Sequence, residues 1–322
     1  MFADVTAGHI EAAARRLGGV ALRTRLIRSA PLSALAGGDV WLKLECEQRT
    51  GSFKLRGAYN SLVTLSPAQR AAGVVASSAG NHGLGCAWAA RELGIAATIY
   101  VPATAPVVKK EGIRALGATV DDRAPHYDAA HELAVAHAAR TGATFVSPQD
   151  GDGVFAGQGT VAIEILEELP ALAAVVVSVG GGGLLGGIGR YLKSRAPQVR
   201  VIGAQGDRSN AMSASVAAGR VVEVPVPATL ADGLSGQVFE EGLRVGLSVM
   251  DEIAVASEEE IGAAIAWLYR THGVIAEGAG AAGVAALRGR RIAVLPTPAA
   301  VVVTGSNINP EVHARVLREF PA

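Results

Sequence analysis

A single lysine stands among small residues in the stretch 50–58, which reads Thr-Gly-Ser-Phe-Lys-Leu-Arg-Gly-Ala. Gly51, Ser52 and Gly57 would let another molecule approach the backbone beside Lys54 closely. An amine in such a partly desolvated position loses its proton readily and can form a Schiff base with a carbonyl group. An ordinary helix-start lysine would give the same local pattern, so the other motifs of the chain must decide between the two interpretations.

A second polar motif, Ser77-Ser78-Ala79-Gly80-Asn81-His82-Gly83, joins an apolar run to a predicted helix at 82–93. Its hydroxyls, the Asn81 amide and the free N–H groups at the helix start could bind a carboxylate or a phenolic oxygen. Serine and asparagine are equally favoured as simple helix N-caps. Both interpretations remain open at this point.

Four consecutive glycines, 180–183, follow an apolar run and precede a helix that ends near Arg195. Successive glycine N–H groups at a helix start can surround a phosphate. Gly181, Gly183 and Gly186 also match G-x-G-x-x-G, so a dinucleotide site is an alternative. That fingerprint requires an acid at the end of the next strand, where this chain has Gln205, with Asp207 only beyond it. A phosphate monoester therefore fits better than a dinucleotide.

Two further motifs are weak in isolation. Glu277 lies in the turn Glu-Gly-Ala-Gly-Ala, and Thr304-Gly305-Ser306-Asn307 follows the last apolar run. A surface acid and a polar turn would explain each of them.

Apolar runs of strand length alternate with helical segments of ten to fifteen residues, which predicts parallel sheets covered by helices. Ligands bind beyond the carboxyl ends of such strands, where the polar motifs fall. The stretch 144–159, rich in Gly, Asp and Gln, interrupts this pattern, and we expect it to be a crossing between two domains. The predicted strands are 40–45, 73–77, 97–101, 118–120, 174–179, 199–203 and 301–304.

The composition excludes several classes of partner. The chain has 322 residues with 29 basic and 29 acidic side chains, which gives no electrostatic footprint for nucleic acid or acidic membranes. It lacks the roughly 18 consecutive apolar residues of a membrane span. Cys46 and Cys86 are too few for a disulfide framework, and the first 16 residues do not resemble a secretory signal. We expect a cytoplasmic protein that binds a small molecule.

The order of these five motifs resembles that of the fold-type II pyridoxal-phosphate (PLP) enzymes, specifically the threonine/serine dehydratase and serine racemase group. The resemblance extends from about Arg23 to Asn309. It implies an α/β fold like that of the tryptophan synthase β subunit, with two open, mostly parallel twisted sheets flanked by helices. It also implies a large PLP-binding domain (1–50 and 145–322), a small domain (51–144) that closes over the substrate, and a homodimer.

The resemblance assigns roles residue by residue. Lys54 would hold PLP as a Schiff base, Phe53 would pack beside its ring, and Asn81 would bond its phenolic oxygen. Thr304, or Ser306 in its place, would face the pyridine nitrogen, because this chain reads T-G-S-N where many dehydratases read S-G-G-N. The phosphate would lie on Gly180, Gly181, Gly182, Gly183 and Leu184; Glu277 and Gly233 would line the pocket; the substrate carboxylate would contact Ser78, Ala79, Gly80, Asn81 and His82.

The implied reaction is β-elimination from a β-hydroxy amino acid such as L-threonine or L-serine, giving a 2-oxo acid and ammonia. Lys54 would remove the α-proton as general base. A neutral hydroxyl opposite the pyridine nitrogen makes the cofactor a weaker electron sink than an aspartate would. Prompt loss of the β-leaving group is therefore favoured over a long-lived carbanion.

Two departures from the racemase-like members refine this expectation. Racemases have a second base, a serine, where this chain has Ala79, which favours a lyase. Their divalent-cation site uses two acids at the positions of Gln205 and Ala211, and hard cations need anionic oxygen ligands. We therefore expect no metal site. The chain ends at Ala322, so we also expect no regulatory extension.

Several alternatives remain. The substrate could be another β-hydroxy amino acid, such as a 3-hydroxyaspartate, a phenylserine or an ectoine-derived amino acid, or the chain could racemise serine or aspartate. From different classes, it could be a nucleotide-binding module that uses the loop 180–186, or a PLP-binding protein without turnover.

Overall fold

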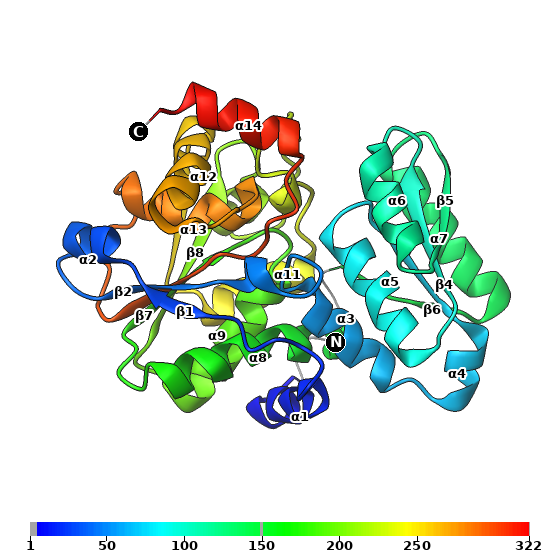
Figure 1. The fold of residues 1–322 in the computed structure, drawn as a ribbon. Coiled ribbons are helices and arrows are strands. Elements are labelled where there is room, and N and C mark those ends of the chain that lie inside the picture. Colours follow the sequence, from blue (N-terminus) through cyan, green and yellow to red (C-terminus); the bar gives the residue numbers. More distant parts are fainter. Residues whose placement is uncertain (1–4, 149–150, 322) are drawn as a thin grey trace.

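The computed structural model describes residues 5–148 and 151–321. Figure 1 shows two lobes, a larger one that contains α1 (Ala7–Leu17) and α14 (Pro310–Glu319) and a smaller one that contains the helices from α4 (Pro67–Ala72) to α7 (Tyr127–Thr141) and the strands from β3 (Val74–Ser77) to β6 (Thr144–Phe145). Each lobe has its own sheet, so the predicted fold of two mostly parallel sheets flanked by helices is confirmed. Among the described helices, none combines the length and the apolar character needed to cross a membrane.

The larger sheet has six strands in the order β1-β2-β10-β7-β8-β9. Only the edge strand β1 runs antiparallel to its neighbour; the other pairs are parallel. The strands are β1 (Leu26–Arg28), β2 (Val40–Lys43), β7 (Ala174–Ser178), β8 (Arg200–Gly206), β9 (Glu252–Ala256) and β10 (Ala299–Val302).

The smaller sheet is entirely parallel, in the order β5-β4-β3-β6. Its strands are β3 (Val74–Ser77), β4 (Ala97–Pro102), β5 (Thr119–Ala124) and β6 (Thr144–Phe145). Phe145, which the expected domain boundary assigned to the larger unit, pairs here with Val75 of the smaller sheet.

Helices cover both faces of each sheet. Those of the smaller lobe and its junction are α3 (Lys54–Val63), α4 (Pro67–Ala72), α5 (Asn81–Leu93), α6 (Val107–Ala115) and α7 (Tyr127–Thr141). Those of the larger lobe are α1 (Ala7–Leu17), α2 (Ala30–Ala36), α8 (Asp152–Glu168), α9 (Gly183–Arg195), α10 (Ala211–Ala218), α11 (Glu240–Val249), α12 (Glu258–His272), α13 (Gly278–Arg288) and α14 (Pro310–Glu319), with short 3-10 turns η2 (Glu45–Glu47) and η3 (Asp232–Leu234).

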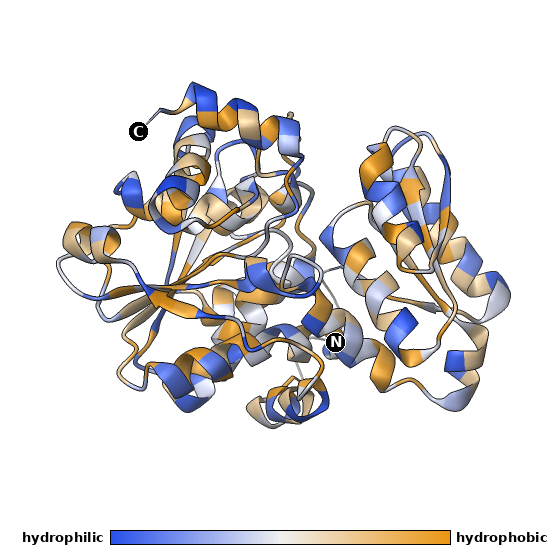
Figure 2. Cartoon of the chain, in the orientation of Figure 1, coloured by the Kyte–Doolittle hydropathy of each residue, from blue (hydrophilic) through white to orange (hydrophobic). Residues whose placement is uncertain are grey.

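Alternate strand residues serve two separate cores. In β7, Ala174 and Val176 pack with α12 and α13, whereas Val175 and Val177 pack with α8 and α9 on the other face. This follows from the period-two alternation of strand side chains. Because both faces are covered, the central strands β7 and β10 are apolar and buried, and much of the centre of the larger sheet is orange in Figure 2. The edge strand β5 differs, because it carries Asp121, Asp122 and Arg123.

The stretch 144–159 begins in β6 of the smaller sheet and ends inside α8 of the larger lobe, so its second half is helical. Its glycines let helices approach one another. A Cβ on Gly157 would lie 2.5 Å from the Arg56 carbonyl oxygen in α3, and one on Gly159 would lie 2.8 Å from the Gly187 carbonyl oxygen in α9.

Candidate active site

Lys54 is the first residue of α3, and the loop before it is fixed to the loop after β10. The Phe53 N–H donates to the Thr304 carbonyl (3.2 Å), and Ser52 pairs with Gly305 in an isolated bridge. Gly51 has a φ of +72°, a conformation that favours glycine. Two motifs 250 residues apart in sequence thus form one structural unit, and this unit sets where the lysine begins its helix.

The Lys54 amine is buried where the two lobes meet. It donates a short hydrogen bond to the Pro148 carbonyl and lies 5.3 Å from the centroid of the Phe53 ring. Burial lowers the pKa of this amine to about 8, against an ordinary value of 10.5. This residue therefore has the property that a Schiff-base lysine needs, because a substantial fraction is unprotonated near neutral pH.

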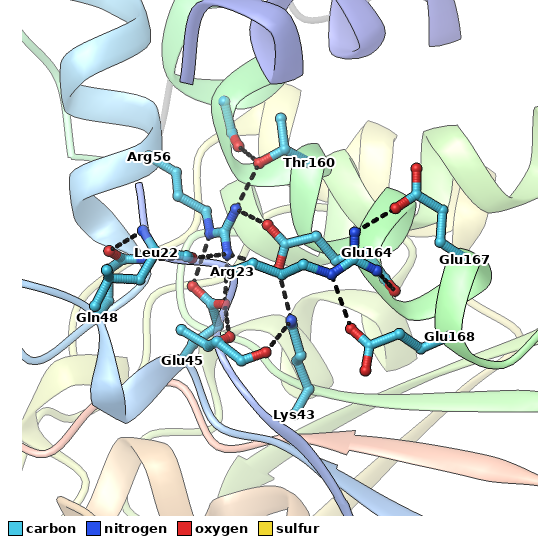
Figure 3. Close-up of polar contacts among 12 residues, drawn as sticks. Leu22, Arg23, Lys43, Glu45, Gln48, Arg56, Thr160, Glu164, Glu167 and Glu168 are labelled. Atoms are coloured by element: carbon cyan, nitrogen blue, oxygen red, sulfur yellow. Dashed lines mark hydrogen bonds and ion pairs between the residues drawn. The ribbon is translucent and has the colours of Figure 1, made fainter. Parts of the chain in front are cut away.

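A cluster of buried charged side chains fixes the start of α3 to the larger lobe. Arg56, two residues after Lys54, is 1% exposed and pairs with Glu45 and Glu164, while Lys43 also pairs with Glu164 (Figure 3). Two cations and two anions balance one another, and the Thr160 hydroxyl accepts a further bond from Arg56 (3.2 Å). The start of α3 is thus joined through charge-assisted hydrogen bonds to β2, η2 and α8.

Helix α5 packs closely on the start of α3. A Cβ on Gly85 would lie 3.2 Å from the Lys54 carbonyl carbon. His82 contacts the Val146 carbonyl through Nε2 (2.8 Å) and the Cys86 sulfur (3.4 Å). Burial lowers the pKa of His82 to about 3, so this imidazole is neutral and its side chain is engaged in the smaller lobe.

The glycine loop leads from β7 into the N-terminus of α9, as the sequence predicts. Gly182 has a φ of +99°, and a Cβ on Gly180 would lie 3.4 Å from the Cα of Leu234 in η3. The first turn of α9 leaves N–H groups without helical partners, and the helix dipole favours an anion there. This is a suitable cradle for a phosphate group.

Glu277 and Asn81 meet across the two lobes. The Asn81 amide donates to Glu277 Oε1 (2.5 Å), and a Cβ on Gly305 would lie 2.3 Å from the same oxygen. Burial, with the charge of Asp232, raises the pKa of Glu277 to about 7 despite the Asn81 bond. The predicted site residues from the Ser/Asn loop, the E-G-A-G turn and the strand-end turn therefore lie together.

Thr304 and Ser306 differ in what their hydroxyls do. The Ser306 hydroxyl donates to the Cys46 carbonyl (2.8 Å) and is thereby part of the loop structure. Thr304 is 3% exposed, and its hydroxyl makes no hydrogen bond within residues 5–148 and 151–321. Of the two, Thr304 has the hydroxyl that is available to a ligand.

Gln205 and Asp207, which bear on the metal and dinucleotide alternatives, have structural partners. The Gln205 amide donates to the Val179 carbonyl (2.8 Å) and accepts from the Ser213 N–H (2.8 Å), so it joins β8 to α10. Asp207 accepts from the Glu258 N–H at the start of α12 (3.1 Å). In the described part of the chain, no group of three or more His, Cys, Asp or Glu side chains has an arrangement that could hold a metal ion.

The residues present fit PLP. A buried amine with a lowered pKa lies beside an aromatic ring, and the glycine loop offers a phosphate cradle. The buried hydroxyls of Ser52 and Ser178, next to these elements, have no partner among the described residues. Buried polar atoms normally have a hydrogen-bond partner, so two buried hydroxyls without one are consistent with a polar ligand at this site.

Sequence reasoning missed three polar contacts of this site. The Pro148 carbonyl accepts from Lys54, Asn307 bonds to Asn81, and Lys109 of α6 pairs with Asp232 of η3 (3.2 Å) across the lobes. Only Asn307 carried a sequence signal, as the last residue of the strand-end turn. The other two depend on how the lobes are placed.

Two mostly parallel α/β sheets, a lysine of lowered pKa where the lobes meet and a glycine loop at a helix start are the features expected of a PLP enzyme of fold type II. The family model for pyridoxal-phosphate dependent enzymes matches residues 19–305. The chain belongs to this family and uses PLP as its cofactor.

Individual relatives indicate which kind of enzyme within the family this chain is similar to. An L-threonine ammonia-lyase of Thermotoga maritima is 43% identical over 319 residues, which cover 98% of this chain and 79% of the relative. Among solved structures, maize serine racemase gives a TM-score of 0.91 at 28% identity, covering 98% of this chain and 97% of its own. Threonine deaminase isoform 2 of Solanum lycopersicum gives 0.90 at 30% identity, covering 97% and 87%. Within the family, the chain groups with the PLP-dependent ammonia-lyases.

Proposed function

We propose that this enzyme deaminates L-threonine and L-serine by β-elimination to a 2-oxo acid and ammonia, with Lys54 as Schiff-base lysine and general base. The observation that carries the proposal is the buried Lys54 amine with a pKa of about 8, adjacent to Phe53 and fixed by the strand-end turn. The similarity to threonine ammonia-lyases supports the choice of substrate.

Bound PLP supplies the electron sink that makes the α-proton of an amino acid removable and allows the β-hydroxyl to leave. Lys54 holds the cofactor and, as an amine of lowered pKa, takes the α-proton. The loop Gly180, Gly181, Gly182 and Gly183 with the Leu184 N–H binds the phosphate. Thr304 would face the pyridine nitrogen, a choice supported by the Ser306 hydroxyl, which already donates to the Cys46 carbonyl (2.8 Å).

The substrate carboxylate binds at the start of α5 in this proposal. The helix begins at Asn81, so its first N–H groups have no helical acceptors, and the positive end of its dipole favours an anion. Ser78 contributes its hydroxyl, whose oxygen already accepts from the Gly80 N–H (3.2 Å), and the N–H groups of Ala79, Asn81 and His82 complete the site. Glu277 and Gly233 line the pocket on the opposite side, where a Cβ on Gly233 would lie 3.9 Å from Glu277 Oε1.

Racemisation is the second candidate, favoured by the likeness to maize serine racemase. A racemase must deliver a proton to the face of the α-carbon opposite Lys54. Ala79 at the candidate position carries no ionisable group, so we propose elimination as the main outcome. We also propose that no divalent cation binds at Gln205, whose amide joins β8 to α10.

The remaining proposals concern the whole molecule. Residues 51–144, with the smaller sheet extended to Phe145 by β6, form a small domain that closes on the substrate. The cross-lobe pair Lys109–Asp232 supports this idea. We also propose a cytoplasmic homodimer, a state carried over from the family resemblance. The free, buried thiols of Cys46 and Cys86 suit a reducing compartment.

The test uses purified protein loaded with PLP. L-threonine, L-serine and threo-3-hydroxyaspartate are each supplied, and 2-oxo acid, ammonia and the D-enantiomer of the amino acid are measured. We expect deamination of threonine or serine, and loss of activity and of the visible cofactor band in Lys54→Ala. Both should be retained in Lys193→Ala, which removes a half-buried lysine of α9 that pairs with Asp251. A coloured protein without ammonia release would overturn the lyase assignment, and D-serine as the main product would establish the racemase.

A further inference from the structure

We propose that Asn307 is a positioning residue that sets which way the Asn81 side-chain amide faces, and so decides whether Asn81 can donate a hydrogen bond to the cofactor. The inference rests on the proposed role of Asn81 at the phenolic oxygen of PLP. It adds a residue from the larger lobe that acts only through Asn81.

The orientation of Asn307 is fixed by a backbone carbonyl. Asn307 Nδ2 donates to the Thr50 carbonyl oxygen (2.8 Å), and a carbonyl can only accept. The NH2 group of Asn307 must therefore point to Thr50, and its oxygen must point away. Gly51 makes room for this arrangement, because a Cβ there would lie 2.6 Å from Asn307 Oδ1.

Asn307 in turn determines the orientation of the Asn81 side-chain amide. The same Nδ2 atom donates its second proton to Asn81 Oδ1 (2.6 Å). An amide has nearly the same shape in either orientation, so packing alone distinguishes its oxygen from its nitrogen poorly. With a donor on one side, Asn81 must present its oxygen to Asn307 and its NH2 group to Glu277, where Nδ2 lies 2.5 Å from Oε1.

In this orientation, the Asn81 NH2 group has one N–H that Glu277 does not accept. The Asn81 NH2 group carries two protons, of which Glu277 accepts one. The second is available to another acceptor, which under the proposed role of Asn81 would be the phenolic oxygen of PLP. If the amide turned over, its oxygen would face both the Glu277 carboxylate and the phenolic oxygen, and the donor would be lost. Through the Asn307 amide, the Thr50 carbonyl thus sets the orientation of the Asn81 amide in the other lobe.

The test replaces Asn307 with an isosteric acceptor. In Asn307→Asp the carboxylate faces the Thr50 carbonyl and Asn81 Oδ1 without a proton to give, so the Asn81 amide turns its NH2 group toward residue 307. We expect a shift of the visible cofactor band and of its titration midpoint in the substrate-free holoenzyme. We also expect kcat to fall by about tenfold or more, with KM changed less, as the loss of a hydrogen bond to a charged group predicts.

Asn309→Asp is the matched control. Asn309 lies two residues along the chain and caps α14 by accepting from the Glu311 N–H (2.8 Å), a role that aspartate also performs. We expect its spectrum, titration and kcat to match those of the unmodified protein. Asn307→Ala, which removes the donor without adding a charge, serves if Asn307→Asp does not fold, and it should shift the band in the same direction.

A double variant separates positioning from a general structural effect. Because Asn307 acts through Asn81, Asn307→Asp combined with Asn81→Ala should have the band and titration midpoint of Asn81→Ala alone. Additive shifts, or an unchanged band in Asn307→Asp, would overturn the proposal. If Asn81→Ala itself leaves the band unchanged, the proposed role of Asn81 is wrong. Failure to deaminate threonine would instead contradict the proposed substrate and leave the spectroscopic test intact.

Discussion

Arg56 and Glu45 form a buried bidentate ion pair directly beneath the start of α3. Arg56 Nε lies 2.8 Å from Glu45 Oε2 and Nη2 lies 2.8 Å from Oε1, and Glu45 is fully buried (Figure 3). Arg56 lies two positions after Lys54 in α3. The geometry therefore couples the position of the reactive amine to a set of charges that no solvent screens.

Removing the charge of Glu45 should destabilise the protein strongly. In Glu45→Gln, the shape is kept, but Arg56 faces an amide in place of one of its two carboxylates. Breaking a buried pair costs about 3–5 kcal/mol, and an exposed pair is worth about 0–1 kcal/mol. The control is Glu47→Gln, in the same turn, whose partner Arg25 has 63% of its side chain exposed. Urea unfolding of the cofactor-free variants measures both, and equal small losses would contradict the prediction.

The same pair predicts an acid sensitivity. Burial alone would raise the pKa of Glu45, but Arg56 beside it brings the pKa below its ordinary value of 4.5. Because the folded pKa is depressed, the pair contributes its full stability above about pH 4.5 and loses it as the pH falls through the folded pKa. Thermal unfolding between pH 7 and pH 3 should therefore show a steeper acid loss in the unmodified protein than in Glu45→Gln. Parallel curves would show that other carboxylates dominate.

Cofactor attachment should report the pKa of Lys54. Only the unprotonated amine attacks an aldehyde, so the rate of attachment to cofactor-free protein should rise with pH and level off near 8. An N-acetyl-lysine reference in solution should level off near the ordinary value of 10.5. Stopped-flow absorbance from pH 6 to pH 11 measures both profiles. A protein profile that still rises beyond pH 10 would mean that burial does not lower this pKa.

The sequence predicts more of the strands than of the helix contacts, and the reason is physical. Buried parallel strands are apolar on both faces, so runs such as 174–179 stand out locally. The glycines of α8 are typical of loops, and the contacts that require them are distant in the sequence. Gly157, for example, packs against Arg56 and Gly57 of α3, about a hundred positions earlier. The glycine loop is a candidate from its residue types alone, whereas Lys54 and Glu277 become candidates only through the order of the motifs and the family resemblance. The Asn307–Asn81 bond could not be predicted, because it depends on two loops that only the fold brings together.

The α3–α8 contact gives a prediction of its own. In Gly157→Ala, the new methyl group would lie 2.5 Å from the Arg56 carbonyl oxygen and 2.7 Å from the Gly57 Cα, so the helices must move apart. We expect a loss of about 1–3 kcal/mol from overpacking. In the control Gly112→Ala, on α6, the methyl group meets only Leu84 at 3.5 Å, and the better helix propensity of alanine should stabilise by up to about 1 kcal/mol. Similar effects of both changes in urea unfolding would contradict the close approach.

The two hydroxyls of the strand-end turn allow the role at the pyridine nitrogen to be assigned by experiment. Thr304→Val removes a hydroxyl that has no partner among the described residues and keeps the shape of the side chain. We expect kcat to fall by about tenfold or more and the cofactor band to shift, whereas Thr304→Ser, which retains the hydroxyl, should keep both nearly unchanged. Ser306→Ala removes the donor to the Cys46 carbonyl (2.8 Å) and should cost about 1 kcal/mol of stability with little effect on kcat. Spectra, kcat and urea midpoints of the three variants, measured together, separate the roles. If Ser306→Ala shifts the band and Thr304→Val does not, the serine faces the cofactor and the loop contact must rearrange when PLP binds.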